Sequence, residues 1–367
     1  MRPEYSLIIL TVLAGAGQGL FFFLVTGDMA GFAKGSRVPP NVVVMGIAWA
    51  LALTLLGMAA SFFHLAHKAR GIKAINKWRY SWLSREVVLL PVFVALLALY
   101  GFMRGSHMIP VLIEMGPKPQ EDGSVMLYSS MYYSFNPLVI QAVGIAGIAV
   151  AFALFISTAM IYGHLKIIRE WGTAFTPMNF TLTGLICGGA LIMTVYQAGF
   201  SPFGAALFNM RLFFAIAFVG LVVKLLYYYR NSRPYSPTTI QTALGINHPK
   251  IRLMETGSAY PTYNTMEYHY TGLEGSRSLM KTASIFLLYI IPMAALAWDY
   301  MALISGGKAC MGWVAAACAM TGAFMERWLF FVEGNHAQNH YYGNFPAPTA
   351  INPILQPGKK DAPLPPA

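Results

Sequence analysis

The segment AASFFHLAHKARGIKAINKWRYSWLSREVV, residues 59–88, contains the pattern from which the fold can be predicted. An apolar stretch ends at His64, a connector with six basic residues and no acid follows, and the next apolar stretch begins at Glu86. Apolar stretches of about 20 residues have the length that crosses a bilayer as a helix. The segment therefore predicts two membrane spans joined by a short basic connector at one membrane edge.

The composition excludes an ordinary water-soluble protein. Of the 367 residues, 56% are hydrophobic and 11% are charged, whereas soluble domains contain about 25% charged residues. We therefore expect an all-α polytopic membrane protein that folds as an eight-transmembrane-helix bundle. The predicted spans are residues 6–27, 41–65, 86–103, 136–163, 178–197, 207–229, 281–304 and 309–333.

The basic residues lie mainly in loops on one side of this bundle. The net charge is +11, but the cations lie between apolar spans, so they indicate orientation and lipid headgroup contact rather than nucleic-acid binding. The connectors after the second, fourth and sixth spans hold most of them. By the positive-inside rule this side, with both termini, faces the cytoplasm. A basic face is also suited to an acidic partner.

An amphipathic pattern runs through the first basic connector, where apolar residues recur every three or four positions, at Ile72, Ile75, Trp78 and Trp82. Such spacing predicts a short helix at the membrane interface, with tryptophans at headgroup depth. We expect Trp78, Arg79 and Trp82 to be its interfacial anchors. The helix is expected to form a floor over the ends of the second and third spans.

We expect one membrane domain at residues 1–333 and an extended tail, rich in proline and alanine, at residues 334–367. The connector at residues 231–278 is long and contains a tyrosine-rich run. Loops of this length are usually functional or disordered, and aromatic side chains favour protein contact. We expect it to dock a partner on the cytoplasmic side; the alternative is a loop that folds back on its own bundle.

Two pairs of glycines predict close helix packing. Gly15 and Gly19 lie four residues apart in the first span, and Gly184 and Gly188 do so in the fifth. This spacing lets helix backbones approach closely. We expect ordinary bundle packing at these positions.

Charges inside the spans are expected to pair. Asp299 in the seventh span and Arg211 in the sixth lie at similar depth near the outer face. Pairing is the least costly way to hold charge in hydrocarbon. We expect the two to form a structural ion pair.

His64 and Glu86 are the main candidates for chemistry. A histidine titrates near neutral pH and donates hydrogen bonds, which suits a quinone carbonyl, and a carboxylate at the membrane edge can relay protons. Arg70 can orient that carboxylate or polarise an oxygen. The alternative for His64 is a helix-end histidine bonded to a backbone carbonyl. Arg327 lies near the same edge in the last span and can complete the pocket rim; the alternative is a side chain that extends to water.

Haem and metal are not expected in this chain. Haem ligation needs two facing histidines inside the bundle, and only His64 and His164 lie near the same helix ends. His336 and His340 have a spacing suited to metal, but no acidic third ligand is near. Three cysteines without a CxxC pair cannot hold an iron–sulfur cluster. No arrangement for covalent catalysis is present, so we assign no catalytic residue and do not expect the chain to act on a substrate by itself.

Three groups of residues resemble the dimethyl sulfoxide reductase anchor-subunit family (DmsC-like). They are Phe63-His64-Leu65 with Trp78-Arg79-Tyr80-Ser81-Trp82-Leu83-Ser84-Arg85-Glu86; Thr158-Ala-Met-Ile-Tyr162 with Trp171 and Thr176-Pro177-Met178-Asn179-Phe180; and Glu326-Arg327-Trp328-Leu329-Phe330-Phe331. The loop at residues 247–276 resembles the branch that contains the membrane subunits of phenylacetyl-CoA:acceptor oxidoreductase and sulfite dehydrogenase.

The resemblance implies an eight-helix anchor without haem. It implies two partners, a four-cluster ferredoxin-like subunit with 4Fe-4S clusters and a catalytic subunit with a molybdenum or tungsten bis-pterin. In the family, the residues that match His64, Glu86 and Arg70 are implicated in quinol binding. The family commonly continues with glycine and proline after the histidine, where this chain has Ala66 and Lys68. The helix is therefore expected to run on past His64, so that the local geometry of the pocket differs from that of the family.

We therefore expect the anchor subunit of an oxidoreductase complex in a bacterial or archaeal inner membrane. It is expected to pass electrons from a cytoplasm-facing dehydrogenase to menaquinone or ubiquinone. The alternatives are quinol oxidation for a terminal reductase, a purely structural tether, and, from another class, a membrane transporter.

Overall fold

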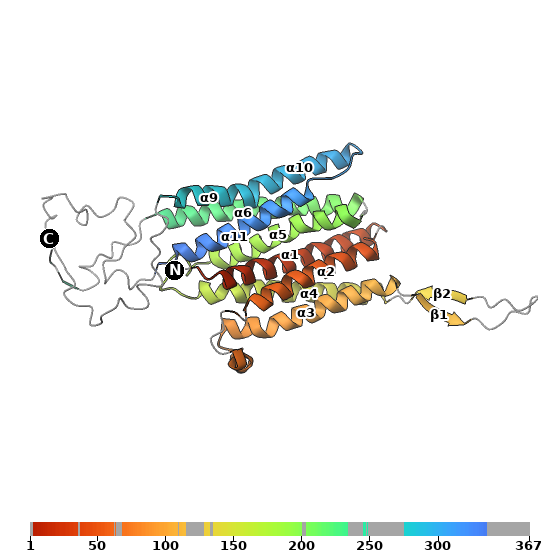
Figure 1. Ribbon diagram of the computed structural model, residues 1–367, viewed down its shortest axis with the longest axis horizontal. Coiled ribbons are helices and arrows are strands. Elements are labelled where there is room, and N and C mark those ends of the chain that lie inside the picture. Colours follow the sequence, from red (N-terminus) through yellow and green to blue (C-terminus); the bar gives the residue numbers. More distant parts are fainter. Residues whose placement is uncertain are drawn as a thin grey trace, which may run out of the picture.

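Eight long helices run side by side in the computed structural model (Figure 1). The structure describes residues 3–35, 37–61, 63, 68–108, 110–114, 128–132, 135–199, 203–233, 245–246, 248 and 275–335. The long helices are α1 (Tyr5–Ala33), α2 (Pro40–Ser61), α3 (Trp82–Gly105), α4 (Pro137–Gly163), α5 (Phe175–Gly199), α6 (Phe203–Ser232), the continuous α9 (Arg277–Ile285), η3 (Phe286–Ile290) and α10 (Ile291–Ile304), and α11 (Gly312–Glu333). All eight are long and apolar enough to cross a membrane. The predicted all-α polytopic fold is confirmed.

Local sequence explains where two of the helices begin. The Ser81 side chain accepts a hydrogen bond from the Ser84 amide, 3.4 Å away, at the start of α3. The Asn136 side chain accepts one from the Leu138 amide, at 2.9 Å, and Pro137 occupies the first turn of α4. Serine and asparagine caps satisfy amides that have no partner within the helix, and proline fits the first turn because it lacks such an amide.

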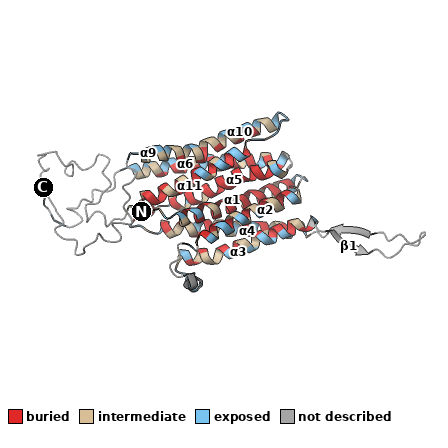
Figure 2. Cartoon of the chain, viewed as in Figure 1, coloured by how far each residue is buried: buried red, intermediate tan, exposed pale blue. Residues whose placement is uncertain are grey.

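The helices α1 and α5 form the centre of the bundle. In their most apolar stretches 78% and 83% of the residues are buried, against 33% in α3 and in α4. Figure 2 shows this burial concentrated along α1, α5 and α11, with exposed residues on the outer helices. The exposed residues of the outer helices are largely apolar, as expected of surfaces that face lipid.

The two glycine pairs pack against each other at the centre. A Cβ atom added to Gly188 would lie 2.0 Å from the backbone carbon of Gly19, and one added to Gly19 would lie 2.1 Å from the Gly184 oxygen. No side chain fits in such a gap, so only glycine lets α1 and α5 approach this closely. The close approach predicted from the glycine spacing is confirmed.

We expect Gly188→Ala to destabilise the bundle, because even one methyl group forces α1 and α5 apart. Overpacking of this kind costs about 1–3 kcal/mol. The measurement is the midpoint of thermal unfolding in detergent. Gly204→Ala in α6 is the matched control, since an added Cβ there meets nothing within 4 Å. Equal midpoints for the two variants would contradict this packing.

The seventh span contains one irregular turn. The π-helical η3 is followed by Pro292, which has no amide to continue the hydrogen-bond ladder to Leu288. Gly322 of α11 lies against this turn, since a Cβ added to it would lie 2.5 Å from the Leu288 nitrogen. The wide π-helical turn of the seventh span thus lies where Gly322 of α11 packs closely against it.

Because the number of spans is even, α1 begins and α11 ends at the same end of the bundle, which we call the basic end (Figure 1). The connector between α2 and α3 lies at this end and forms the short 3₁₀ helix η1 (Lys68–Lys77). Figure 1 shows η1 extending outward past α3. The predicted floor over the helix ends is therefore wrong, although the predicted short helix is present.

At the opposite end, the connector between α3 and α4 contains two strands that the sequence reasoning did not anticipate. The strands β1 (Pro110–Glu114) and β2 (Tyr128–Tyr132) pair antiparallel, with Pro110 opposite Tyr132. The predicted docking loop at residues 231–278 and the tail at residues 334–367 lie almost wholly outside the described residues. Their roles stay predictions.

Candidate functional site

Glu86 lies in the second turn of α3, at the basic end. Its side chain is buried, and its Oε1 accepts a hydrogen bond from Thr158 Oγ1 of α4 at 2.8 Å. The salt bridges between described residues all involve other carboxylates. Within the part of the chain that the structure describes, Glu86 therefore has a neutral hydroxyl as its partner and no cation within salt-bridge distance.

The other predicted members of the site lie on the connector before Glu86. His64 falls outside the described residues, and Arg70 lies in η1 with a side chain that is not described. The described part of this connector runs from Lys68 to the start of α3, beside Glu86. The structure thus describes the position of Glu86, and the roles of His64 and Arg70 stay predictions.

The predicted interfacial anchors lie where η1 meets α3. Trp78 and Arg79 follow the end of η1 and are exposed, and Trp82 begins α3. Arg85 closes this turn, because its Nε donates to the Trp78 oxygen at 3.1 Å and its Nη2 to the Arg79 oxygen at 2.9 Å. The Arg85 guanidinium also lies 4.1 Å from the centre of the Trp82 ring. Exposed aromatics held on a basic turn suit the headgroup region.

Arg327 does not lie at a pocket rim. Its side chain is 2% exposed and points into the bundle, where Nη1 donates to Glu326 Oε2 at 2.7 Å. The guanidinium lies 3.6 Å from the centre of the Phe180 ring. The predicted rim position is wrong, and so is the alternative of a side chain that extends to water, because the adjacent carboxylate and aromatic face hold the charge inside.

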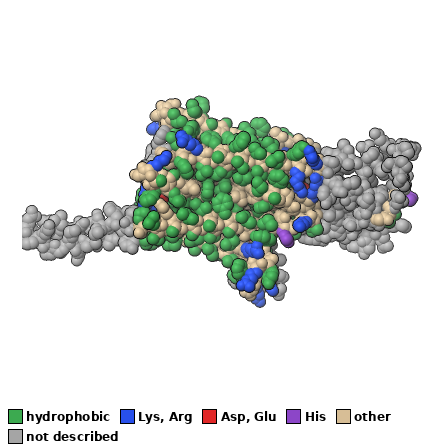
Figure 3. Space-filling model, turned by 180° about the vertical axis from the view of Figure 1, so that it is seen from behind, with side chains coloured by type: hydrophobic (Ala, Val, Ile, Leu, Met, Phe, Trp, Pro, Cys, Tyr) green, Lys and Arg blue, Asp and Glu red, His purple; other side chains and the backbone are tan. Residues whose placement is uncertain are grey.

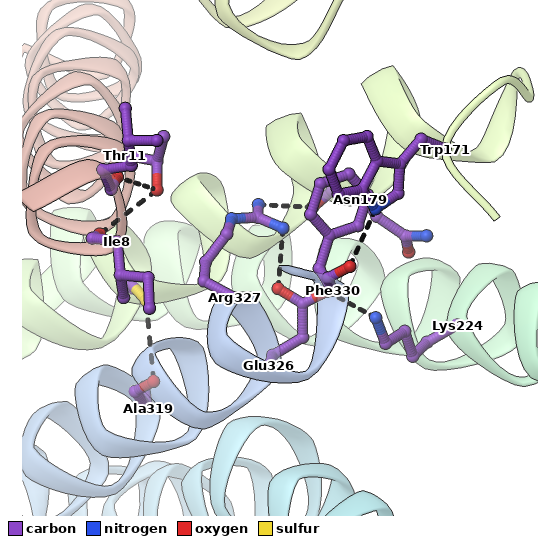
Figure 4. Close-up of polar contacts among 11 residues, drawn as sticks. Ile8, Thr11, Trp171, Asn179, Lys224, Ala319, Glu326, Arg327 and Phe330 are labelled. Carbon is purple, nitrogen blue, oxygen red and sulfur yellow. Dashed lines mark hydrogen bonds and ion pairs between the residues drawn. The ribbon is translucent and has the colours of Figure 1, made fainter. Parts of the chain in front are cut away.

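Lys224 of α6 is the partner that sequence reasoning missed. Its Nζ forms an ion pair with Glu326 Oε1, so that Glu326 lies between two cations, as Figure 4 shows. Lys224 and Glu326 are 2% and 1% exposed. A lone lysine in an apolar span was the available signal, because charge in a membrane interior requires a partner. We call Lys224, Glu326 and Arg327 the ion triad.

An aromatic cluster lies between Glu86 and the ion triad; its members are Tyr162, Trp171, Phe180, Phe330 and Phe331. Trp171 Nε1 donates to the Phe330 oxygen at 2.8 Å, and the two rings stack at 5.4 Å. Tyr162 packs against Trp171 at 5.5 Å and Phe180 at 6.0 Å. Tyr162 lies one helical turn after Thr158, which binds Glu86. All three motif groups that carried the family resemblance thus meet at the basic end.

The predicted pair of Asp299 and Arg211 is wrong. Asp299 Oδ1 accepts hydrogen bonds from the amides of Cys310, at 2.8 Å, and Met311, at 2.9 Å. Arg211 is exposed and donates to the Tyr300 hydroxyl at 3.1 Å. The amides at the start of α11 need acceptors, and they offer Asp299 several donors at once.

A second buried ion pair, which the sequence reasoning did not predict, lies at the end opposite the basic end. Asp28 Oδ1 binds Arg104 Nη2 at 2.9 Å, and Asp28 Oδ2 accepts from the Tyr100 hydroxyl at 2.9 Å. No group of three or more histidine, cysteine or acidic side chains placed to hold a metal occurs among the described residues. Asp28 and Glu326 are each neutralised by a cation, whereas the partner that the described residues offer Glu86 is a hydroxyl.

These features define a polytopic eight-helix membrane protein whose basic end holds a buried acid, Glu86, that no described cation neutralises. The comparisons with known proteins identify its family. Residues 1–115, which include Glu86, match the family model of the DMSO reductase anchor subunit (DmsC). A sulfite dehydrogenase subunit of Allochromatium vinosum is 32% identical over 347 residues, which cover 93% of this chain and 99% of that protein. The anaerobic dimethyl sulfoxide reductase chain YnfH of Escherichia coli is 24% identical over 60% of this chain and 67% of its own length.

The chain belongs to the DmsC family, and it is a membrane anchor subunit of the kind that serves oxidoreductase complexes. The family resemblance expected from the three motif groups is therefore confirmed. The similarity to the sulfite dehydrogenase protein extends over almost the whole chain, beyond the region that the family model matches.

Proposed function

We propose that this chain anchors a molybdenum or tungsten bis-pterin oxidoreductase in the inner membrane and passes electrons between a docked four-cluster iron–sulfur subunit and quinone. The almost full-length similarity to a subunit of a sulfite dehydrogenase supports electron flow from a substrate to menaquinone or ubiquinone. The weaker similarity to a reductase chain keeps quinol oxidation as the alternative direction.

The partner of Glu86 is the observation that carries this proposal. A buried charge that only stabilises a membrane protein is normally paired, as Glu326 and Asp28 are. Among the described residues, Glu86 instead has the Thr158 hydroxyl as its partner, and it lies in α3 shortly after the exposed basic connector. A carboxyl group in this position can take up and release a proton, which a permanently paired carboxylate does poorly.

Quinone reduction consumes two electrons and two protons, so the site must supply protons from water. In this proposal His64 donates a hydrogen bond to a quinone oxygen, Glu86 relays protons, and Arg70 polarises the oxygen or orients the carboxylate. Arg327 is left out of this site, because Glu326 and the Phe180 ring hold its guanidinium inside the bundle. The described spans are continuous helices apart from η3, whereas many transporters bind substrate between broken helices; this favours the anchor.

We expect Glu86→Gln to lower quinone reduction by the assembled complex roughly 100-fold or more, because the amide keeps the shape of the side chain and cannot relay a proton. The reduction of a soluble dye by the partner subunits should stay unchanged. Glu4→Gln, at an exposed acid of the basic end, is the control with full quinone activity. Full quinone reduction in Glu86→Gln would refute the proposed role.

The proposed orientation places the basic end, and both termini, in the cytoplasm. Cytoplasmic loops carry an excess of lysine and arginine, and the connectors of the basic end hold most of the chain's cations. Figure 3 shows Lys and Arg side chains at both ends of an almost wholly hydrophobic flank. A C-terminal reporter that is active only in the cytoplasm tests it. An inactive reporter, together with activity of a periplasm-specific reporter at the same position, would place the partner subunits outside and favour the terminal reductase.

A further inference from the structure

The connector between α4 and α5, residues 164–174, is hydrogen-bonded to the ends of α6 and α11. Arg169 Nη2 donates to the backbone oxygens of Arg230, at 3.1 Å, and Arg233, at 2.9 Å. Arg230 Nη1 donates back to the Arg169 oxygen at 3.1 Å. Trp171 is buried and bonded to the Phe330 oxygen. The connector therefore joins the ends of α6 and α11 at the basic end.

The outer surface of this connector is basic and partly apolar. Lys166 is exposed and Ile167 is 52% exposed, while Arg233 is exposed at the adjacent end of α6. The one acid of the connector, Glu170, accepts a hydrogen bond from the Asn335 amide at 3.3 Å. Burial raises the pKa of the Glu170 carboxyl above its ordinary value. The exposed charge is thus positive, and we call Lys166, Ile167 and Arg233 the docking surface.

The location of this surface distinguishes it from η1. The connector leads into α5, which has the largest buried share among the spans, and it lies across the ends of α6 and α11. Lipid headgroups surround a bundle at its edge, where η1 lies outside α3 (Figure 1). The connector of Ile167 is bonded to the ends of α6 and α11 and leads into the buried α5, so this apolar side chain among cations is better placed for a protein than η1 is.

We propose that the docking surface binds an acidic, partly apolar patch of the electron-transfer subunit, and that η1 contacts lipid instead. This inference rests on the proposed function, because it requires such a subunit. Opposite charges steer encounter between partners and fix their register, and electron-transfer contacts are small. The buried aromatic cluster lies directly beneath this connector and extends towards Thr158 and Glu86.

The first test reverses charge in the complex purified through a tag on this chain. We expect Lys166→Glu with Arg233→Glu to weaken retention of the electron-transfer subunit roughly tenfold or more at low salt, and to reduce its salt dependence. The hydrogen bonds that join the connector to the end of α6 remain in this variant, because Arg169 binds the backbone oxygen of Arg233 and not its side chain. Lys73→Glu with Lys77→Glu, the same total charge change at two exposed residues of η1, should retain the subunit fully.

The second test does not alter charge. Ile167→Cys, labelled with a photocrosslinker in a Cys310→Ser background, should crosslink to the electron-transfer subunit. Ile145→Cys in α4 is the matched control, because Ile145 and Ile167 have equal exposure, at 52%, and Ile145 should label lipid. Lipid labelling from position 167, or equal loss of the subunit in the Lys73 and Lys77 double variant, would overturn the inference.

These tests separate docking from the proposed function. Glu86→Gln should lose quinone reduction with the subunit still bound, whereas the charge reversal should lose the subunit with Glu86 intact. A wild-type chain that purifies without any iron–sulfur subunit would refute the proposed function itself. A bound subunit that ignores both docking variants would refute only the docking surface.

Discussion

Glu326→Ala should prevent the chain from accumulating as a folded protein. The substitution leaves Lys224 and Arg327 buried with no counter-charge, and breaking a buried ion pair costs about 3–5 kcal/mol. Both cations are 2% exposed, so neither reaches water without rearrangement. The measurement is the yield of monodisperse protein in detergent and its thermal unfolding midpoint. We expect the largest stability loss of any single substitution proposed for this chain.

Two variants show whether this loss comes from unpaired charge. Arg211→Ala removes an exposed cation from the same helix as Lys224 and should cost less than about 1 kcal/mol. Replacement of the whole ion triad, by Lys224→Met, Glu326→Leu and Arg327→Met together, should recover part of the stability, since apolar residues often replace buried ions without loss. A triple variant less stable than Glu326→Ala would contradict this explanation.

His64→Ala should abolish quinone reduction by the complex, with a loss of roughly 100-fold or more. The imidazole is proposed to donate the hydrogen bond that holds a quinone oxygen beside Glu86, and alanine leaves neither donor nor titratable group. The measurement compares substrate-dependent quinone reduction with dye reduction by the same preparation. Only the quinone rate should fall.

His107→Ala provides the control, because His107 belongs to the short helix η2 (Ser106–Met108) at the opposite end of the bundle. Its quinone rate should equal that of the wild-type complex. An unchanged quinone rate in His64→Ala would remove His64 from the site. Equal loss of both rates would show a failure of assembly and would argue against a role in quinone binding alone.

The sequence by itself determined the number of spans, the glycine positions at which helices can approach closely, and the basic end. That α1 and α5 are the two helices that meet there came from the structure. Bilayer thickness fixes the length of an apolar helix, and a missing side chain at Gly19 or Gly188 is visible without knowing its neighbour. Glu86 was also found from sequence, because an acid that opens an apolar span after a basic connector is unusual.

Only the tertiary structure decided which groups meet. Thr158 and Glu86 are 72 positions apart, and Lys224 and Glu326 are 102 positions apart, so no local pattern relates them. Arg327 bonds to the adjacent Glu326 and lies against the Phe180 ring of α5, a contact that only helix packing creates. Asp299 bonds to amides at the start of α11 and not to Arg211. The hydropathy of a segment can be read from that segment alone and predicts its span. A contact between side chains of two helices depends on how the helices pack, and is therefore known only from the assembled bundle.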